Sequence, residues 1–210
     1  MILSKADYQF YLEADRISLD RKVKYSLKEL AIRGFVLQDH VWEFQKLLRK
    51  TEFLKNSKHD LLGLVRYGIT LREFDQMCVK LGLHINPNNF GPGLCITHTG
   101  SIVIHAAARL GANCRIHPGV VIGTSDESSG APKLGDNIYI GPGAKIYGQI
   151  EIADNAVIGA NSVVNRSFGE PGITIAGVPA RRVSNRDSGG CLIKATEVLR
   201  GKLSVPRTNI

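Results

Sequence analysis

The middle of the chain carries a large aliphatic residue at nearly every sixth position. The residues with this spacing are Ile104, Leu110, Ile116, Ile122, Leu134, Ile140, Ile146, Ile152, Ile158 and Val164. The step from Ile122 to Leu134 is twelve residues, which is two periods. The residue four positions after each of these anchors is also mostly small or apolar. A period of six fits neither an α-helix nor a simple two-residue alternation.

This period predicts short strands joined by tight turns, with three units closing one triangular coil. The large side chains then point into the interior, and stacked coils align them in ladders. We therefore expect a mostly β fold, a parallel β-helix of hexapeptide repeats. Phe90, Ile96 and Ile102 are also six residues apart, but Ile104 follows after only two, so the first coil is expected to be irregular.

The segment Gly123 to Lys133, "GTSDESSGAPK", interrupts the repeat with Gly, Ser and charged residues. Such a composition is typical of a loop that leaves the β-helix. The loop is either a tolerated insertion or a lid over a site. We favour a lid, because loops held by a rigid scaffold often carry function.

Residues 1–82 lack the six-residue period. Apolar residues at helical spacing over 41–48 and 61–77 predict three or four helices there. We expect this N-terminal α-helical domain to cap the exposed edge of the first coil and to mediate assembly. The β-helix domain is then expected over 83–183, followed by a C-terminal tail at 184–210 with a short helix.

Composition narrows the function classes. The chain has 210 residues, of which 43% are hydrophobic and 22% are charged, with a formal net charge of +8. Lys and Arg are interspersed with acids and form no long run, which argues against nucleic acid as a partner. No apolar run is long enough to span a bilayer. The N-terminus lacks a secretory h-region and the four cysteines are scattered, so we expect a cytoplasmic protein with reduced thiols.

The stretch "FGPGLCITHTGSIVI" places His98 between two threonines, with Gly100 close behind. A histidine on a strand is either a base or a satisfied polar side chain on an apolar wall. His105 and His117 each follow an anchor directly. No pair of histidines and cysteines has metal-ligand spacing, so we expect no catalytic metal.

These segments resemble one family. "HTGSIVI", the hexapeptide ladder, "IGPGAKIYGQIEIADNAVIGANSVV" and "AGVPAR" are similar to serine acetyltransferases and their relatives over roughly residues 85–183. The short N-terminal helices are more similar to relatives associated with surface-polysaccharide biosynthesis. The resemblance implies that the β-helix is left-handed, that acetyl-CoA is the cosubstrate, and that a homotrimer holds active sites between neighbouring subunits. A dimer of trimers through the helical domain is a further expectation.

The resemblance also implies roles for individual residues. His98 matches the general base that takes the proton of the acceptor hydroxyl. Candidate acceptor-site residues are Thr97, Asn86, His105 and His117. The cofactor arm is expected to run past Gly123, Thr124, Pro142 and Ala160, with Lys133 and Arg181 as candidates for the nucleotide phosphates.

Three positions depart from the serine enzymes. The family has an acidic residue before the base and Arg and His before the "PK" pair, where this chain has Thr97, Gly130 and Ala131. A zwitterion needs partners for both of its charges. We therefore lean towards an O-acetyltransferase whose small-molecule acceptor is a sugar hydroxyl of a surface-polysaccharide precursor. The alternatives are a serine O-acetyltransferase of cysteine biosynthesis and, in another class, a noncatalytic trimeric scaffold or binding protein.

Overall fold

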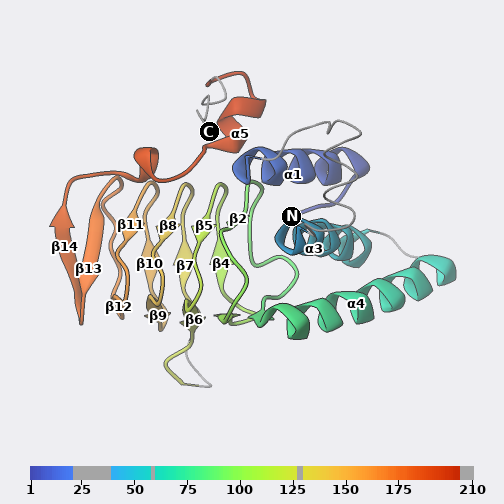
Figure 1. Cartoon of the computed structure of the whole chain (residues 1–210), viewed down its shortest axis with the longest axis horizontal. Coiled ribbons are helices and arrows are strands. Elements are labelled where there is room, and N and C mark those ends of the chain that lie inside the picture. Colours follow the sequence, from blue (N-terminus) through green and yellow to red (C-terminus); the bar gives the residue numbers. More distant parts are fainter. Residues whose placement is uncertain (21–38, 58–59, 127–129, 204–210) are drawn as a thin grey trace.

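The computed structural model of the chain describes residues 1–20, 39–57, 60–126 and 130–203. As the sequence pattern and the resemblance together predict, its body is a left-handed parallel β-helix preceded by helices (Figure 1). The prism has three faces, each built from strands of successive coils. The first face contains β1 (Leu83–His84), β3 (Ile102–Ile104), β6 (Val121–Gly123), β9 (Lys145–Tyr147) and β12 (Val163–Val164). The second contains β4 (Arg109–Leu110), β7 (Lys133–Leu134) and β10 (Glu151–Ile152).

The third face is the largest and ends in the only antiparallel pair among the described strands. It contains β2 (Cys95–Ile96), β5 (Arg115–Ile116), β8 (Tyr139–Ile140), β11 (Val157–Ile158), β13 (Thr174–Gly177) and β14 (Ala180–Ser184). Its strands pair in parallel in the order β2, β5, β8, β11 and β13, and β14 then folds back antiparallel on β13. This turn back covers the edge that the last coil would otherwise expose.

The strand register explains the hexapeptide pattern. Ile96, Ile116, Ile140 and Ile158 are directly paired across four neighbouring strands, so they form one ladder inside the prism. All ten aliphatic anchors are buried. The irregularity expected in the first coil lies in β3, where Ile102 and Ile104 both point inward and Ile102 pairs with Leu83 of β1.

One corner of the prism is held by a ladder of asparagines. Asn113, Asn137 and Asn155 all have positive φ, between 55° and 59°, a conformation that asparagine tolerates better than most residues. The Asn113 amide donates to Asn137 at 2.7 Å, and the Asn137 amide donates to Asn155 at 3.0 Å. Asn113 also donates to the hydroxyl of Thr196, which ties the C-terminal helix α5 (Ala195–Leu199) to the β-helix.

Three helices lie within the described part of residues 1–82: α1 (Lys5–Ser18), α3 (His40–Asn56) and α4 (Leu61–Leu81). Ser4 and Asp7 form a capping box at the start of α1, and Asp39 and Asp60 cap α3 and α4. α4 ends at Gly82, whose φ of 70° suits glycine and turns the chain directly into β1. No helix of the described residues is long and apolar enough to cross a membrane.

The helices α1 and α3 lie at the β2 end of the prism (Figure 1). The Gln45 side chain of α3 donates to the Leu94 carbonyl at 2.8 Å and accepts from the Ile96 amide at 3.2 Å. A side-chain amide therefore satisfies backbone groups that the first strand of this face leaves open, as expected for a cap. Phe44 of α3 stacks on Phe74 of α4 and joins both helices to the core.

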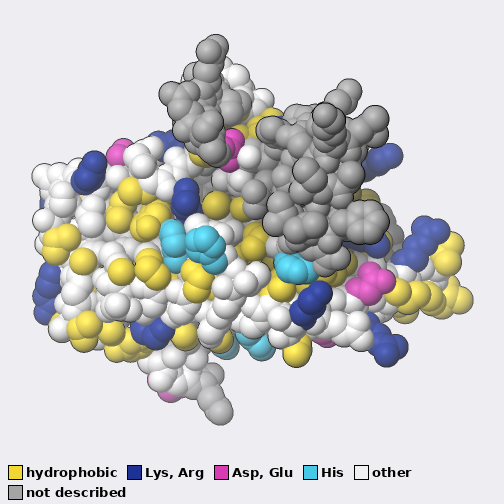
Figure 2. Space-filling model, viewed as in Figure 1, with side chains coloured by type: hydrophobic (Ala, Val, Ile, Leu, Met, Phe, Trp, Pro, Cys, Tyr) yellow, Lys and Arg dark blue, Asp and Glu magenta, His cyan; other side chains and the backbone are white. Residues whose placement is uncertain are grey.

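The far end of α4 extends away from the body and carries uncovered apolar side chains (Figures 1 and 2). The exposed large hydrophobic residues in this half of α4 are Leu61, Leu62, Leu64, Val65 and Ile69. The helix prediction from their spacing is confirmed, but the face that they form has no partner among the described residues of this chain.

The chain leaves the prism between β6 and β7, where the sequence predicts a loop (Figure 1). Residues 127–129 of this loop lie outside the described residues. After β14, a short 3-10 helix η1 (Ser188–Gly190) and α5 bring the chain back beside α1. The predicted short helix of the tail is α5, and residues 204–210 lie outside the described part.

Candidate functional site

His98 lies at the turn that follows β2, on the corner between the third and first faces. Ile96 points into the core, so Cys95 and Thr97 alternate to the outer side. The Thr97 hydroxyl donates to the Ile116 carbonyl at 3.2 Å, and its amide donates to the same oxygen at 3.1 Å. These bonds fix the residue before His98, while the His98 side chain itself is exposed to solvent.

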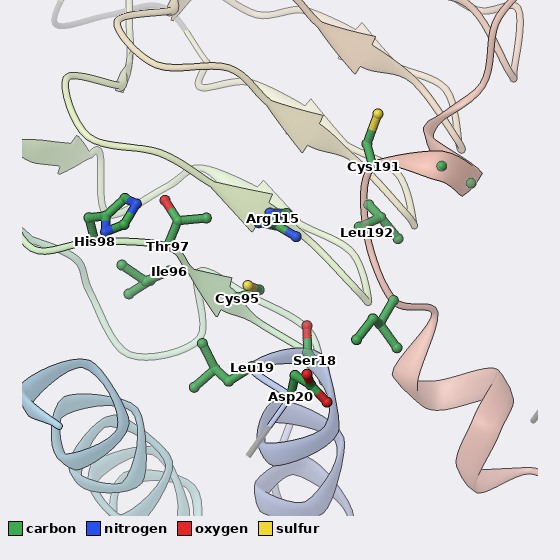
Figure 3. Close-up of a pocket in the computed structure, with 13 residues that line it drawn as sticks. Ser18, Leu19, Asp20, Cys95, Ile96, Thr97, His98, Arg115, Cys191 and Leu192 are labelled. Atoms are coloured by element: carbon green, nitrogen blue, oxygen red, sulfur yellow. The ribbon is translucent and has the colours of Figure 1, made fainter. Parts of the chain in front are cut away.

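A cavity of about 510 Å³ opens beside His98, over the outer side of β2 and β5 (Figure 3). The end of α1, the first two strands of the third face and the segment after β14 enclose it. Its lining residues are Ser18, Leu19, Asp20, Cys95, Ile96, Thr97, His98, Arg115, Gly189, Gly190, Cys191, Leu192 and Ile193. The cavity therefore combines an imidazole, a guanidinium, a carboxylate and two thiols with apolar walls.

His117 occupies the position next to Thr97 on the following coil, because Ile96 pairs with Ile116. Its Nδ1 lies 2.9 Å from the Ile140 carbonyl, and its ring packs on Tyr139 with 4.9 Å between centroids. A carbonyl only accepts, so Nδ1 carries the proton and Nε2 is left as an acceptor. Burial lowers the pKa of His117 below its usual value, the hydrogen bond to the Ile140 carbonyl opposes this shift, and the charge of Arg115 lowers the pKa further.

Arg115 is a site residue that the sequence reasoning missed. It pairs with Cys95 across β2 and β5, and its side chain enters the cavity (Figure 3). Its Nε is buried and has no hydrogen-bond partner among the described residues. The signal in the sequence was its place one residue before the anchor Ile116, on the outer side of a strand. That position alone does not tell which face of the prism the side chain occupies.

The predicted cofactor residues lie on different parts of the prism. In the strand register, Pro142 and Ala160 occupy the same corner as His98 on later coils, about 4.8 Å apart per coil. Gly123 is on another corner, in register with His105 and Tyr147, and Thr124 follows it.

Two further cofactor candidates are basic side chains. Lys133 lies on the second face, where its ammonium is 3.5 Å from Glu151 and both side chains are largely exposed. Arg181 lies on β14, and its guanidinium donates to the Ala180 carbonyl at 3.0 Å. Within one chain, these residues do not converge on a single pocket.

The candidate acceptor residues also lie at different places on the prism, and only some of them are at the His98 cavity. Thr97 lines the His98 cavity, and His117 lies beside it. Asn86 lies elsewhere, with its amide donating to the Ile104 carbonyl at 3.2 Å and its backbone N–H donating to the Asn89 side chain. His105 is exposed on the Gly123 corner, where its Nδ1 accepts from the Ala107 amide. In the described chain, Asn86 and His105 thus have local backbone partners away from the cavity.

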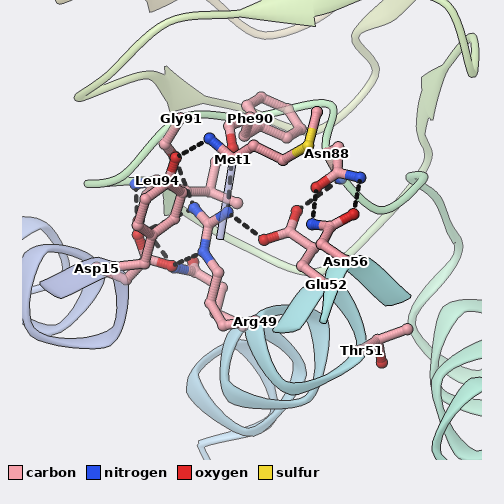
Figure 4. Close-up of polar contacts among 12 residues, drawn as sticks. Met1, Asp15, Arg49, Thr51, Glu52, Asn56, Asn88, Phe90, Gly91 and Leu94 are labelled. Atoms are coloured by element: carbon pink, nitrogen blue, oxygen red, sulfur yellow. Dashed lines mark hydrogen bonds and ion pairs between the residues drawn. The ribbon is translucent and has the colours of Figure 1, made fainter. Parts of the chain in front are cut away.

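A buried ion cluster fixes the segment that leads into β2 (Figure 4). The Arg49 guanidinium of α3 pairs with Asp15 of α1 at 2.8 Å and with Glu52 at 2.9 Å, and all three side chains are at most 1% exposed. Arg49 also donates to the carbonyls of Phe90 and Gly91. Burial alone would lower the pKa of Arg49, but the two carboxylates raise it above its usual value, so the guanidinium stays charged.

The two carboxylates of this cluster also accept hydrogen bonds from the backbone of residues 88–94. Asp15 accepts from the amides of Gly93 and Leu94, both at 2.8 Å. Glu52 accepts from the Asn88 amide at 2.7 Å. Three charged side chains from two helices therefore set the path of residues 88–94, only a few positions before His98. Among the described residues, no group of three or more His, Cys, Asp or Glu side chains could hold a metal ion.

Comparison with known proteins shows which family has this architecture. Residues 131–166 match the family described as bacterial transferase hexapeptide (six repeats). The serine acetyltransferase of Escherichia coli (strain K12) is 38% identical over 168 residues, which are 79% of this chain and 56% of that protein. The chain spans 42 to 56% of the length of three such curated relatives.

Solved structures extend the similarity into the helices. The crystal structure of the Neisseria gonorrhoeae serine acetyltransferase is 31% identical, with a TM-score of 0.65, and the match covers 86% of this chain and 68% of that one. The Brucella abortus serine acetyltransferase in complex with coenzyme A is 27% identical, with a TM-score of 0.67, and the match covers 87% and 70%. The similarity thus includes the helical part as well as the repeat.

Proposed function

This chain belongs to the serine acetyltransferase-like family of hexapeptide-repeat acyltransferases, and we propose that it transfers the acetyl group of acetyl-CoA to the hydroxyl of L-serine. The observation that carries this proposal is the cavity beside His98, on a fold shared with a serine acetyltransferase that binds coenzyme A. The noncatalytic scaffold is the weaker reading, since a scaffold needs no exposed imidazole at the mouth of a cavity.

In the proposed mechanism, His98 is the general base. The imidazole accepts the proton of the acceptor hydroxyl while the oxygen forms a bond to the acetyl carbonyl carbon. The bond from that carbon to sulfur then breaks, and the imidazolium returns the proton to the departing thiolate of CoA. His98 is exposed at a turn, so its imidazole is accessible to two substrates.

The acceptor is the point at which the comparisons change our interpretation. The lean towards a sugar rested on the loss of charged groups at Thr97, Gly130 and Ala131. The relatives named above are serine acetyltransferases, which favours the serine alternative over the sugar. Within one chain, Ala131 is buried near Gln149 and does not line the His98 cavity.

We expect purified protein to release CoA thiol with L-serine at a kcat/KM above about 10⁴ M⁻¹s⁻¹, the lower end of ordinary enzyme efficiency. Nucleotide-activated sugars should react at least tenfold more slowly. A thiol-reactive dye measures release, and mass spectrometry identifies the acetylated product. Release with a sugar but not with serine would restore the sugar reading, and release with neither would favour the scaffold.

The proposal includes assembly into trimers, with the dimer of trimers as its larger form. Two features support it. The residues predicted for one active site occupy different corners of the prism, so a neighbouring copy is needed to bring the Gly123 corner to His98. The apolar side chains exposed on α4 also favour contact with another copy.

Light scattering at micromolar concentration is expected to give three or six times the chain mass. Replacing Leu62 and Val65 of α4 with serine should lower a sixfold mass to a threefold mass without unfolding the protein, because both side chains are more than half exposed. A monomeric mass for the unmodified protein would contradict a site shared between copies. The proposed compartment is the cytoplasm, which agrees with the four cysteines of the described residues, none of which forms a disulfide.

A further inference from the structure

Arg115 has an unusual combination of burial and missing contacts. Its Nε is buried without a hydrogen-bond partner, and no hydrogen bond or ion pair to the guanidinium occurs among the described residues. Buried polar groups in native proteins nearly always have partners, because an unsatisfied one is costly. A guanidinium also stays charged in proteins. Arg115 as a whole is only partly buried and lines the cavity, so its guanidinium can meet a ligand there.

The surroundings of Arg115 define the kind of ligand. It lies on the strand next to the one that leads to His98, and Thr97 lies between the two in Figure 3. The positive charge of Arg115 lowers the pKa of His117, so the guanidinium lies close to the imidazole that neighbours Thr97. Asp20, at the end of α1, lines the same cavity and supplies a carboxylate on its opposite side (Figure 3). Such a cavity fits a small molecule that carries an anionic group.

We propose that Arg115 binds the carboxylate of the acceptor amino acid and so places the acceptor hydroxyl at His98. The guanidinium presents a planar fork of donors that matches a carboxylate with two parallel hydrogen bonds. In serine, the hydroxyl and the carboxylate are separated by only two carbon atoms, so the proposal requires the guanidinium and the imidazole, which line one cavity, to contact the two ends of one small molecule. Arg115 thereby replaces the cationic partner that Gly130 and Ala131 do not provide.

This inference rests on the proposed function, because it takes an amino acid as the acceptor. It also goes beyond that function, since acetyl transfer to a hydroxyl does not by itself require a cationic partner for a carboxylate. The inference makes Arg115 a specificity-determining residue that selects for a carboxylate, whereas His98 acts on any hydroxyl placed beside it. The two roles are separable by an acceptor that keeps the hydroxyl and lacks the carboxylate.

The test compares L-serine with L-serinamide as acceptors for the purified protein. Calorimetry measures the Kd of each, and thiol release from acetyl-CoA measures KM and kcat. In Arg115→Ala, the Kd and KM for L-serine should rise about 10- to 100-fold, the range for losing hydrogen bonds to a charged group. The values for L-serinamide should stay within about threefold. Arg115→Lys should recover part of the loss, because it restores the charge without the fork.

Arg72→Ala is the matched control, since Arg72 is an exposed arginine on α4 outside the cavity. It should leave both acceptors unchanged. The inference is overturned if Arg115→Ala leaves serine binding unchanged, if it weakens serine and serinamide equally, or if the unmodified protein does not bind serine. Serine binding that depends on Arg115 without acetyl transfer would support the inference and reject the proposed function. Transfer to serine with an unchanged KM in Arg115→Ala would do the reverse.

Discussion

Replacing His98 with alanine is expected to lower kcat for acetyl transfer by about 10²- to 10⁴-fold, the usual contribution of a positioned general base. The acceptor hydroxyl is a poor nucleophile at neutral pH, and without the imidazole the site loses the base that is proposed to take its proton. The KM for both substrates should change little, because His98 acts on the reacting proton. Steady-state kinetics with acetyl-CoA and L-serine measure both constants.

The fold of this variant should be intact. His98 is exposed and follows its strand, so the free energy of unfolding should stay within about 0.5 kcal/mol of the unmodified protein. His40→Ala removes an imidazole from the start of α3, outside the cavity, and serves as the matched control. If His98→Ala keeps its kcat while remaining folded, His98 is a surface residue and the proposed mechanism is wrong.

The β-helix was predictable from the sequence because the burial of its side chains repeats at a fixed interval. Each anchor faces the same environment, an interior only wide enough for aliphatic ladders, and that environment repeats every six residues. Ile140 and Ile158 lie in one ladder for this reason, and both are fully buried. The left-handed twist was not contained in the spacing. It came from the resemblance, because a period of six residues does not fix the hand of the coil.

The contacts of the helical cap were not predictable in the same way. The sequence shows helical spacing over residues 41–48, but Gln45 binds Leu94 and Arg49 binds Phe90, and both of these partners lie more than 40 residues away in the chain. A charged residue inside a helical pattern is normally assigned to the solvent side. Nothing local distinguishes Arg49, which is fully buried, from Lys46, which pairs with Glu43 at the surface.

The candidate site was predictable in part. The pattern around His98 singled out this residue, and the resemblance supplied its expected role, but His98 was predicted on a strand and lies at the turn after β2. The sequence predicted less well which face of the prism a residue occupies, because this depends on where each coil begins. His105 and His117 both follow anchors, yet they occupy different corners, since their strands belong to different faces. Arg115 was missed because its significance depends on an absent partner, which only the three-dimensional structure reveals.

Replacing Arg49 with alanine is expected to lower the free energy of unfolding by about 3–5 kcal/mol, the usual effect of removing one partner of a buried ion pair. The change leaves the Asp15 and Glu52 carboxylates buried without their cation. It also frees the carbonyls of Phe90 and Gly91, which Arg49 now satisfies. Since a small domain is stable by only about 5–15 kcal/mol, this loss is a large part of the total.

Urea unfolding followed by circular dichroism measures the change, and two variants separate its causes. Arg49→Met keeps most of the side-chain volume without the charge, so an equal loss in this variant assigns the effect to the ion cluster and not to a cavity. Arg72→Ala removes an exposed arginine of α4 and should cost less than about 0.5 kcal/mol. A loss below about 1 kcal/mol in Arg49→Ala would mean that the carboxylates find other partners, and the cluster would then not be what joins α1 and α3 to the first coil. Because the same cluster sets the path of residues 88–94, a folded Arg49 variant should also show a lower kcat with His98 in place.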